Sequence, residues 1–420
     1  MKPRDRSRTT LAWLSFSLLT FWTPKDAALA QPRIAAETDN QYERVKPSEV
    51  RSHRAPAATP DEDGRYPVEV RGAFGQGIRF GRSHDDFAVQ LRARMQLQGS
   101  LDVPEDDDVA LGARIRRMRL VLGGHALHHL VTYYIQLGFA RPDLEDGNRV
   151  PLRDAFLTFH LHRDANLRLG QMKVPFDRQR VTSSSRLQFV DRAGFVRVLN
   201  LDRDTGIQLY STDLLGLRER LSYQLGVFNG EGRNRISSDL GLLYVGRLQW
   251  TPFGAFDDLS ESDFKRGGPR LAIAGAAAFN HMAQRAGSTQ GALFDEDITL
   301  TDAEDFLHAT ADLLLKFRGA SILIESLLRQ ALNAQRDTES GWGVLAQGGY
   351  LLTPQCELAA RVAHSRPGDS STLAQDTSAG AVFSWYFLQH DLKLQTDYTA
   401  SIDSDRQLAH LLRSQLQLFF

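Results

Sequence analysis

Cysteine and long apolar runs are what this sequence has least of. Cys356 is the only cysteine among 420 residues, which excludes a disulfide framework and a metal site built from several thiolates. After Ala30 no uninterrupted apolar run approaches the ~18 residues that a membrane-spanning helix needs. These two absences exclude a disulfide-stapled domain and a helical membrane protein.

An excess of charge of one sign is also missing. The chain has 50 arginine and lysine residues against 51 aspartate and glutamate residues, a formal net charge of −1. Residues 1–30 hold five basic and two acidic residues, so the remainder has 45 against 49, a net charge of −4. Such a balance gives no indication of a nucleic-acid partner.

Signals for enzyme chemistry are equally scarce. His125, His128 and His129 cluster near one turn, but no carboxylate or cysteine completes a set of metal ligands. The serines of the run 182–185 have no histidine at a suggestive spacing, and no glycine motif that cradles phosphate groups is found. We therefore predict no catalytic residue, no metal ion and no cofactor.

What the sequence does contain begins with an export signal. Lys2, Arg4, Arg6 and Arg8 make the first eight residues positively charged, residues 11–22 (LAWLSFSLLTFW) form a short apolar core, and Ala28-Leu29-Ala30 is a small-residue cleavage site before Gln31. We predict that residues 1–30 are a cleavable secretory signal peptide, because the apolar run is too short to span a membrane. Residues 31–65 are polar and contain four prolines, which predicts a disordered periplasmic extension.

The C-terminal segment 406–420 (RQLAHLLRSQLQLFF) alternates between polar and apolar residues up to the terminal Phe420. One strand face would carry Leu412, Leu416, Leu418 and Phe420, and the other Arg413, Gln415 and Gln417. This pattern is typical of a strand between lipid and a watery lumen. It resembles the closing strand of a bacterial outer-membrane β-barrel, whose terminal aromatic residue is the signal for the barrel-assembly machinery. The alternative is an amphipathic edge strand of a soluble protein.

Strand counting favours the barrel. Sixteen strand-like segments follow residue 86, with the clearest period of two in 86–101, 220–230, 356–366 and 391–401. An even number is typical of a single-chain barrel, here residues 66–420. Short connections, predicted to be periplasmic turns, alternate with longer external loops. The longest loop, 176–203, is the third external one, whereas the turn 253–268 is longer than the rule predicts.

The competing fold is an exported β-sandwich. It needs a second apolar layer, yet the strand faces that would form this layer are charged. They carry Arg92, Arg94, Arg117, Arg119, Arg361, Lys393 and Arg413. So many charges fit a water-filled channel better than a dry core. We therefore predict an all-β transmembrane antiparallel β-barrel of about 16 strands.

Four stretches resemble a known family. They are 113–120 (ARIRRMRL), 153–159 (RDAFLTF), 167–176 (LRLGQMKVPF) and 182–192 (TSSSRLQFVDR), followed by Asp204-Thr205-Gly206. In this order they resemble the phosphate-selective porin O and P family, and a looser likeness extends over residues 68–420. The resemblance implies a homotrimer of sixteen-stranded barrels whose third external loop folds into the lumen and narrows it.

The function that follows is passive diffusion of small hydrophilic solutes across the bacterial outer membrane. Rings of arginine and lysine favour anions, so we predict an anion-preferring porin, with phosphate-like anions as the solutes to test. The predicted pore-lining residues are Arg92, Arg94, Arg117, Arg119, Lys173, Arg178, Arg180, Arg186 and Arg192. Lys173 has the lipid-facing phase unless a bulge intervenes.

The expected partners are small anions in transit, outer-membrane lipid and lipopolysaccharide, the barrel-assembly machinery and two further copies of the chain. The alternative function is a non-porin outer-membrane barrel, either an enzyme or an adhesin. An enzyme would need a set of catalytic side chains that the sequence does not show.

Overall fold

A computed structural model describes residues 68–82, 87–105, 108–127, 129–144, 150–235, 241–294, 303–332, 337–368 and 371–420. The predicted signal peptide (1–30), the predicted extension (31–65) and His128 lie outside these ranges. Within them no helix has the length and apolar character needed to cross a membrane.

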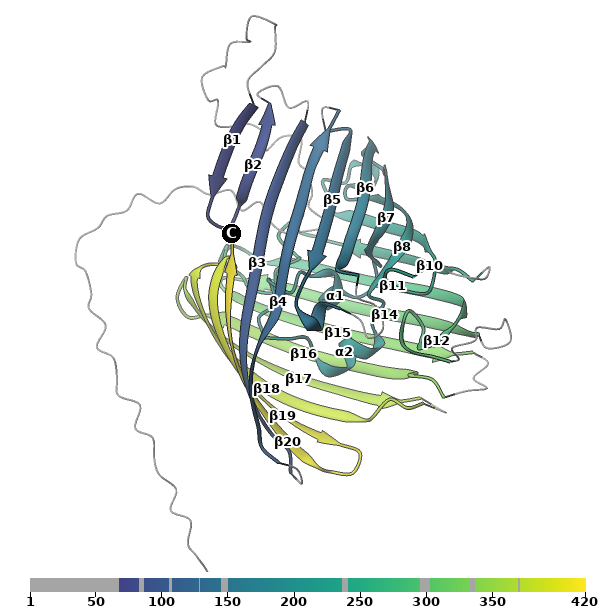
Figure 1. The fold of residues 1–420 in the computed structure, drawn as a ribbon, viewed down its shortest axis with the longest axis vertical. Coiled ribbons are helices and arrows are strands. Elements are labelled where there is room, and N and C mark those ends of the chain that lie inside the picture. Colours follow the sequence, from purple (N-terminus) through teal and green to yellow (C-terminus); the bar gives the residue numbers. More distant parts are fainter. Residues whose placement is uncertain are drawn as a thin grey trace, which may run out of the picture. The chain divides into compact units, whose positions relative to one another are not determined.

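Sixteen antiparallel strands form a closed barrel (Figure 1), which confirms the predicted fold class and strand number. Closure is made by β3, which pairs with β4 on one side and with the last strand, β20, on the other. The strands are β3 (Phe87–Val103), β4 (Ala110–Ala126), β5 (Val131–Gly138), β6 (Leu152–His162), β7 (Ala165–Lys173), β8 (Arg203–Ser211), β9 (Leu221–Phe228), β10 (Leu243–Trp250), β11 (Arg270–Ala283), β14 (Glu304–Phe317), β15 (Ala320–Ala331), β16 (Gly341–Leu351), β17 (Cys356–Pro367), β18 (Asp376–Leu388), β19 (Leu392–Asp403) and β20 (Leu408–Phe419).

A hairpin of β1 (Val68–Ala73) and β2 (Gly77–Arg82) precedes the barrel and extends its sheet. β20 pairs with the segment 94–103 of β3, and β2 pairs with the segment 88–91 (Figure 1). The tilt of barrel strands leaves part of β3 without a partner strand, and the hairpin covers that edge. A second hairpin, β12 (Arg285–Gly287) and β13 (Gln290–Leu293), lies in the connection after β11.

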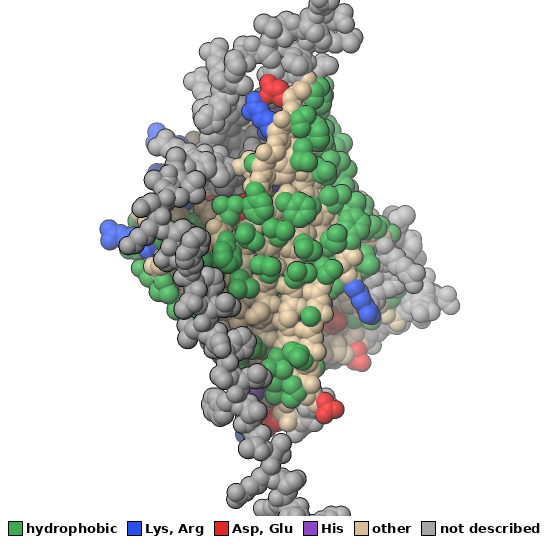
Figure 2. All heavy atoms as spheres, turned by 60° about the vertical axis from the view of Figure 1, so that its left-hand side comes forward, with side chains coloured by type: hydrophobic (Ala, Val, Ile, Leu, Met, Phe, Trp, Pro, Cys, Tyr) green, Lys and Arg blue, Asp and Glu red, His purple; other side chains and the backbone are tan. Residues whose placement is uncertain are grey.

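The outer surface is apolar, as expected for a lipid-facing barrel wall (Figure 2). Leu412 and Leu416 on β20 and the following Phe420 are 43%, 42% and 49% exposed, whereas Gln415 and Gln417 are buried inside. The alternation predicted for the C-terminal strand is therefore confirmed, and the polar set faces the lumen.

The connection between β7 and β8, residues 174–202, is called the inner loop here. It contains α1 (Arg178–Val181) and α2 (Gly194–Leu199), and two single turns of 3-10 helix lie elsewhere, η1 (Arg141–Asp143) and η2 (Leu214–Gly216). Apolar side chains of the inner loop, among them Phe176, Phe195 and Leu199, are buried in one cluster with inward residues of the wall. The inward positions of β11 at 272, 274, 276 and 278 are all alanine, and these small side chains leave room for the loop.

Candidate functional site

The inner loop is bonded to inward side chains on strands far from its own. The Nε of Arg178 donates to Asp312 on β14 (2.5 Å), and the Nε2 of Gln188 donates to Glu357 on β17 (2.7 Å). Charge-assisted bonds of this kind in a dry environment are strong and directional. The loop is therefore held against the inner wall, and the residues around it are the candidate functional site.

Asp191 of the inner loop gathers three arginines from the wall. The Nη2 of Arg117 lies 2.7 Å and the Nε of Arg116 lies 3.0 Å from its carboxylate, and Arg413 lies 3.8 Å away. Burial raises the pKa of Asp191, but the arginines outweigh burial and hold this pKa far below its ordinary value.

Arg116 reaches the lumen through a β-bulge. The register of β3 and β4 shifts between Gln96 and Leu97, so that Arg116 is the extra residue of β4. Period-two reasoning placed only Arg117 and Arg119 inside, and it missed Arg116 because a bulge changes the phase of a strand.

Arg119 is also inside and also neutralised. Its Nη2 donates to Asp143 (2.6 Å), and Arg153 on β6 lies 3.2 Å from the same carboxylate. The neighbouring β6 residue, Asp154, accepts two bonds from Arg203, at 2.9 and 3.0 Å. The wall beside the inner loop is thus a lattice of arginines and aspartates rather than a bare positive strip.

Arg92 and Arg94 of β3, both predicted to line the pore, lie inside the barrel. Arg94 contacts the inner loop, and Arg92 contacts β20, the strand that closes the barrel against β3. Arg94 donates to the hydroxyls of Ser183 (3.1 Å) and Ser184 (3.2 Å) of the inner loop. The guanidinium of Arg92 lies over the ring of Phe419, 5.7 Å from its centroid. The serine run 182–185 therefore contacts an arginine of the wall.

Lys173 lies inside the barrel. Its Nζ donates to the carbonyl of Val181 at 2.9 Å, and the side chain is buried. Gly170, three residues earlier, has a φ of +126°, a conformation that favours glycine and interrupts the strand alternation. The pairing of β7 with β6 and β8 continues through Gly170 without a register shift, so the inward position of Lys173 goes with this glycine and not with the bulge that the sequence left open.

The arginines of the inner loop divide into two kinds. Arg178 binds the carboxylates of Asp312 and Asp258. Arg180 binds that of Asp202, and Arg186 binds that of Asp257. Arg192 instead donates to two carbonyls of its own loop, Gln179 at 2.6 Å and Thr182 at 2.8 Å.

Arg192 keeps its charge in this setting. Burial, together with the charge of Arg180, lowers the pKa of Arg192 to about 9. This value lies above neutral pH, so the guanidinium remains protonated. Its charge is thus bonded to two backbone carbonyls, whereas those of Arg178, Arg180 and Arg186 are bonded to carboxylates.

The buried charges of the described residues are predominantly positive. Seventeen arginine and lysine residues but thirteen aspartate and glutamate residues are buried there, an excess of four positive charges. The whole chain has a net charge of −1. The buried charges are therefore mostly positive although the chain as a whole is slightly negative, and composition alone hides this difference.

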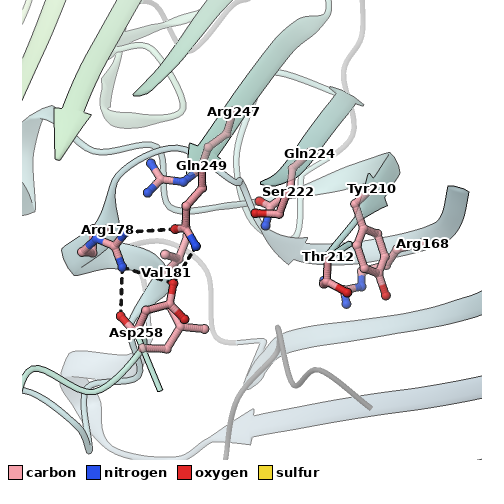
Figure 3. Close-up of a pocket in the computed structure, with 11 residues that line it drawn as sticks. Arg168, Arg178, Val181, Tyr210, Thr212, Ser222, Gln224, Arg247, Gln249 and Asp258 are labelled. Carbon is pink, nitrogen blue, oxygen red and sulfur yellow. Dashed lines mark hydrogen bonds and ion pairs between the residues drawn. The ribbon is translucent and has the colours of Figure 1, made fainter. Parts of the chain in front are cut away.

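A cavity borders the inner loop beneath β8, β9 and β10 (Figure 3). Three arginines line it, Arg168, Arg178 and Arg247, together with one carboxylate, Asp258. Arg168 lies between the rings of Phe156 and Tyr210, 4.7 and 4.9 Å from their centroids. Arg168 and Arg247 were not predicted, because each is a lone charge in an ordinary strand pattern.

No metal centre is found among the described residues, where no three His, Cys, Asp or Glu side chains are grouped to hold an ion. The rings of His125 and His129 stack with centroids 3.6 Å apart. The histidine cluster is thus a ring contact at a turn.

Part of this chain is similar to a known protein family. Residues 89–257 match the model of the family described as phosphate-selective porin O and P. No curated protein sequence matches the chain.

Several solved structures share the fold. The channel DcaP of Acinetobacter baumannii is 11% identical, with a TM-score of 0.54 over 81% of this chain and 99% of that one. An anion-selective porin from Comamonas acidovorans is 11% identical, with a TM-score of 0.54 over 80% of this chain and 100% of that one. A loop-deletion mutant of OmpT from Vibrio cholerae is 12% identical, with a TM-score of 0.51 over 79% and 100%.

At such identities the likeness concerns the fold, which is that of outer-membrane porins. The family match covers the strands and the inner loop on which the sequence resemblance depended. Residues 89–257 therefore match the model of the phosphate-selective porin O and P family, to which the sequence motifs showed a resemblance.

Proposed function

We propose that the protein is an outer-membrane porin through which small anions diffuse passively. The observation that carries the proposal is the excess of four positive charges among the buried side chains of the described residues, in a closed barrel whose arginine-bearing inner loop is bonded to the wall. A positive lumen concentrates anions and excludes cations.

Arginines that are paired with carboxylates suit a channel, which binds anions weakly, better than a site that retains them. An anion that enters meets Arg117 or Arg178 already bound to a carboxylate, so that its own binding is weakened. Arg192, bonded to carbonyls, offers a stronger but single charge. Weak binding at several positions is what conduction requires, because the solute must also leave.

The remaining expectations belong to the same proposal. Residues 1–30 would direct export, Phe420 would be read by the barrel-assembly machinery, and lipopolysaccharide and outer-membrane lipid would surround the apolar wall. The family resemblance supports a homotrimer. The porin fold favours a channel over an enzyme.

Ion selectivity in a planar bilayer tests the proposal. Under a gradient of potassium chloride we expect a reversal potential shifted towards that of chloride, and added phosphate should reduce the chloride current. Cation preference would refute the anion proposal while leaving the porin fold. A folded, heat-modifiable barrel without conductance would favour the non-porin alternatives, an enzyme or an adhesin.

A further inference from the structure

The connection between β10 and β11 is the long turn that sequence reasoning left without an explanation. Its residues 256–263, called the inner strap here, are buried except for Asp257, whose side chain is 43% exposed: Ser260, Glu261, Ser262 and Asp263 are 1 to 3% exposed. Turns at barrel ends ordinarily lie at the surface. The strap has therefore entered the barrel from the end opposite to the inner loop.

The inner strap is bonded to the inner loop by its carboxylates. Arg186 donates to Asp257 (3.0 Å), and Arg178 donates to the carbonyl (2.9 Å) and carboxylate (3.5 Å) of Asp258 (Figure 3). Glu261 accepts the backbone N–H of Gln188 at 2.8 Å. Two of the arginines predicted to select anions are thus neutralised by the strap.

The strap is also bonded to the wall on the far side of the lumen. The hydroxyl of Ser262 donates to Glu357 on β17 (2.8 Å), and Ser260 bonds to His390 after β18 (2.9 Å). The Nζ of Lys316 on β14 donates to the carbonyl of Ser262 at 3.0 Å. These contacts reach from β14 to the end of β18, so the strap crosses that part of the lumen.

We propose that the inner strap forms the second half of the constriction and restrains its anion selectivity. The inner loop supplies positive charge from one end of the barrel, and the strap supplies Asp257 and Asp258 from the other. The inner loop and the inner strap together then form the narrowest region of the lumen. The net charge of this region depends on the ion pairs between the arginines of the loop and the aspartates of the strap. This inference rests on the proposed porin function.

Two variants in a planar bilayer test the effect on transport. Replacing Asp257 and Asp258 together by asparagine should raise the anion-to-cation permeability ratio about threefold, because two charges are removed from the lumen. Replacing residues 256–263 by a short glycine-serine link should raise single-channel conductance at least about twofold. Asp164→Asn is the matched control, since its ion pair with Arg163 (2.8 Å) lies in an exposed turn at the same end.

An unchanged permeability ratio in the double variant, or an unchanged conductance in the shortened strap, would overturn the proposal while the wild type still conducts. A wild type without conductance would instead refute the proposed function, and thiol labelling tests the strap in that case. With Cys356→Ser as background, Ser262→Cys should react about tenfold more slowly with a small thiol reagent than Asp257→Cys. Equal rates in the folded barrel would place the strap outside the lumen and refute the inference.

Discussion

The ring of Phe195 occupies the space that a side chain at Gly343 would need. A Cβ atom built on Gly343 would come within 2.3 Å of the Cδ2 of Phe195, and Phe195 is buried. The absence of a side chain at Gly343 on β16 therefore leaves the space into which Phe195, on α2 of the inner loop, packs.

Gly343→Ala should displace the inner loop. The clash with an aromatic ring is an overpacking change, which costs about 1–3 kcal/mol of stability. We expect a lower temperature for loss of the heat-modifiable form and a noisier, smaller single-channel current, since Phe195 is pushed off the wall. Gly348→Ala on the same strand is the control, because the nearest atom to its Cβ is 3.7 Å away. Equal effects of the two substitutions would contradict the packing of Phe195 against Gly343.

Asp191→Asn should strengthen anion preference. The substitution removes the carboxylate that neutralises Arg116 and Arg117, so the permeability ratio for anions should rise about two- to threefold in reversal-potential measurements. Arg117→Ala should shift the ratio in the opposite direction. Asp305→Asn, at an ion pair with the half-exposed His281, is expected to change neither. A fall in the ratio for Asp191→Asn would show that this carboxylate does not face the anion path.

Anion preference should increase as the pH falls from 7 to 5. Burial raises the pKa of Asp177 to about 6, against the opposing charges of Arg180 and Arg192. A carboxyl group with this pKa is mostly charged at pH 7 and mostly neutral at pH 5, so acidification removes a negative charge from the inner loop. The expected rise in the permeability ratio is about twofold.

Asp177→Asn is the matched variant for this pH profile. Asp177 caps α1 by accepting the N–H of Arg180 at 2.9 Å, and asparagine is an equally good cap. The variant should show the higher ratio already at pH 7 and a flatter profile. The same pH profile in wild type and variant would contradict the assignment to Asp177.

Phe420→Ala should reduce the amount of protein assembled in the outer membrane. The side chain is 49% exposed on the lipid face, while the backbone of Phe420 exchanges two hydrogen bonds with Ala93, at 2.5 and 2.9 Å. Alanine keeps these backbone bonds, so a loss in membrane fractions would report on recognition rather than on barrel closure. Leu416→Ala, an outward residue of the same strand, serves as control, and equal yields of the two variants would refute an assembly role for Phe420.

The sequence by itself determined the wall of this protein. Alternation in 406–420 and 86–101 predicts which side chains meet lipid and which meet the lumen, because a strand has a period of two and the two environments differ in polarity. Arg92, Arg94, Arg117 and Arg119 were placed inside on this basis, and the structure has them there. The motifs between residues 113 and 206 were sufficient to predict the family model that residues 89–257 match.

Only the tertiary structure decided which charged side chains inside the barrel form ion pairs with one another. Arg117 and Asp191 are 74 residues apart, and Arg178 and Asp312 are 134 residues apart, so no local pattern could pair them. The orientation of Arg116 depends on a bulge, and that of Lys173 goes with one glycine of positive φ. The burial of residues 258–263 depends on partners from four other segments. Local periodicity reports the environment of a strand face, whereas the net charge at a constriction arises from contacts between distant segments.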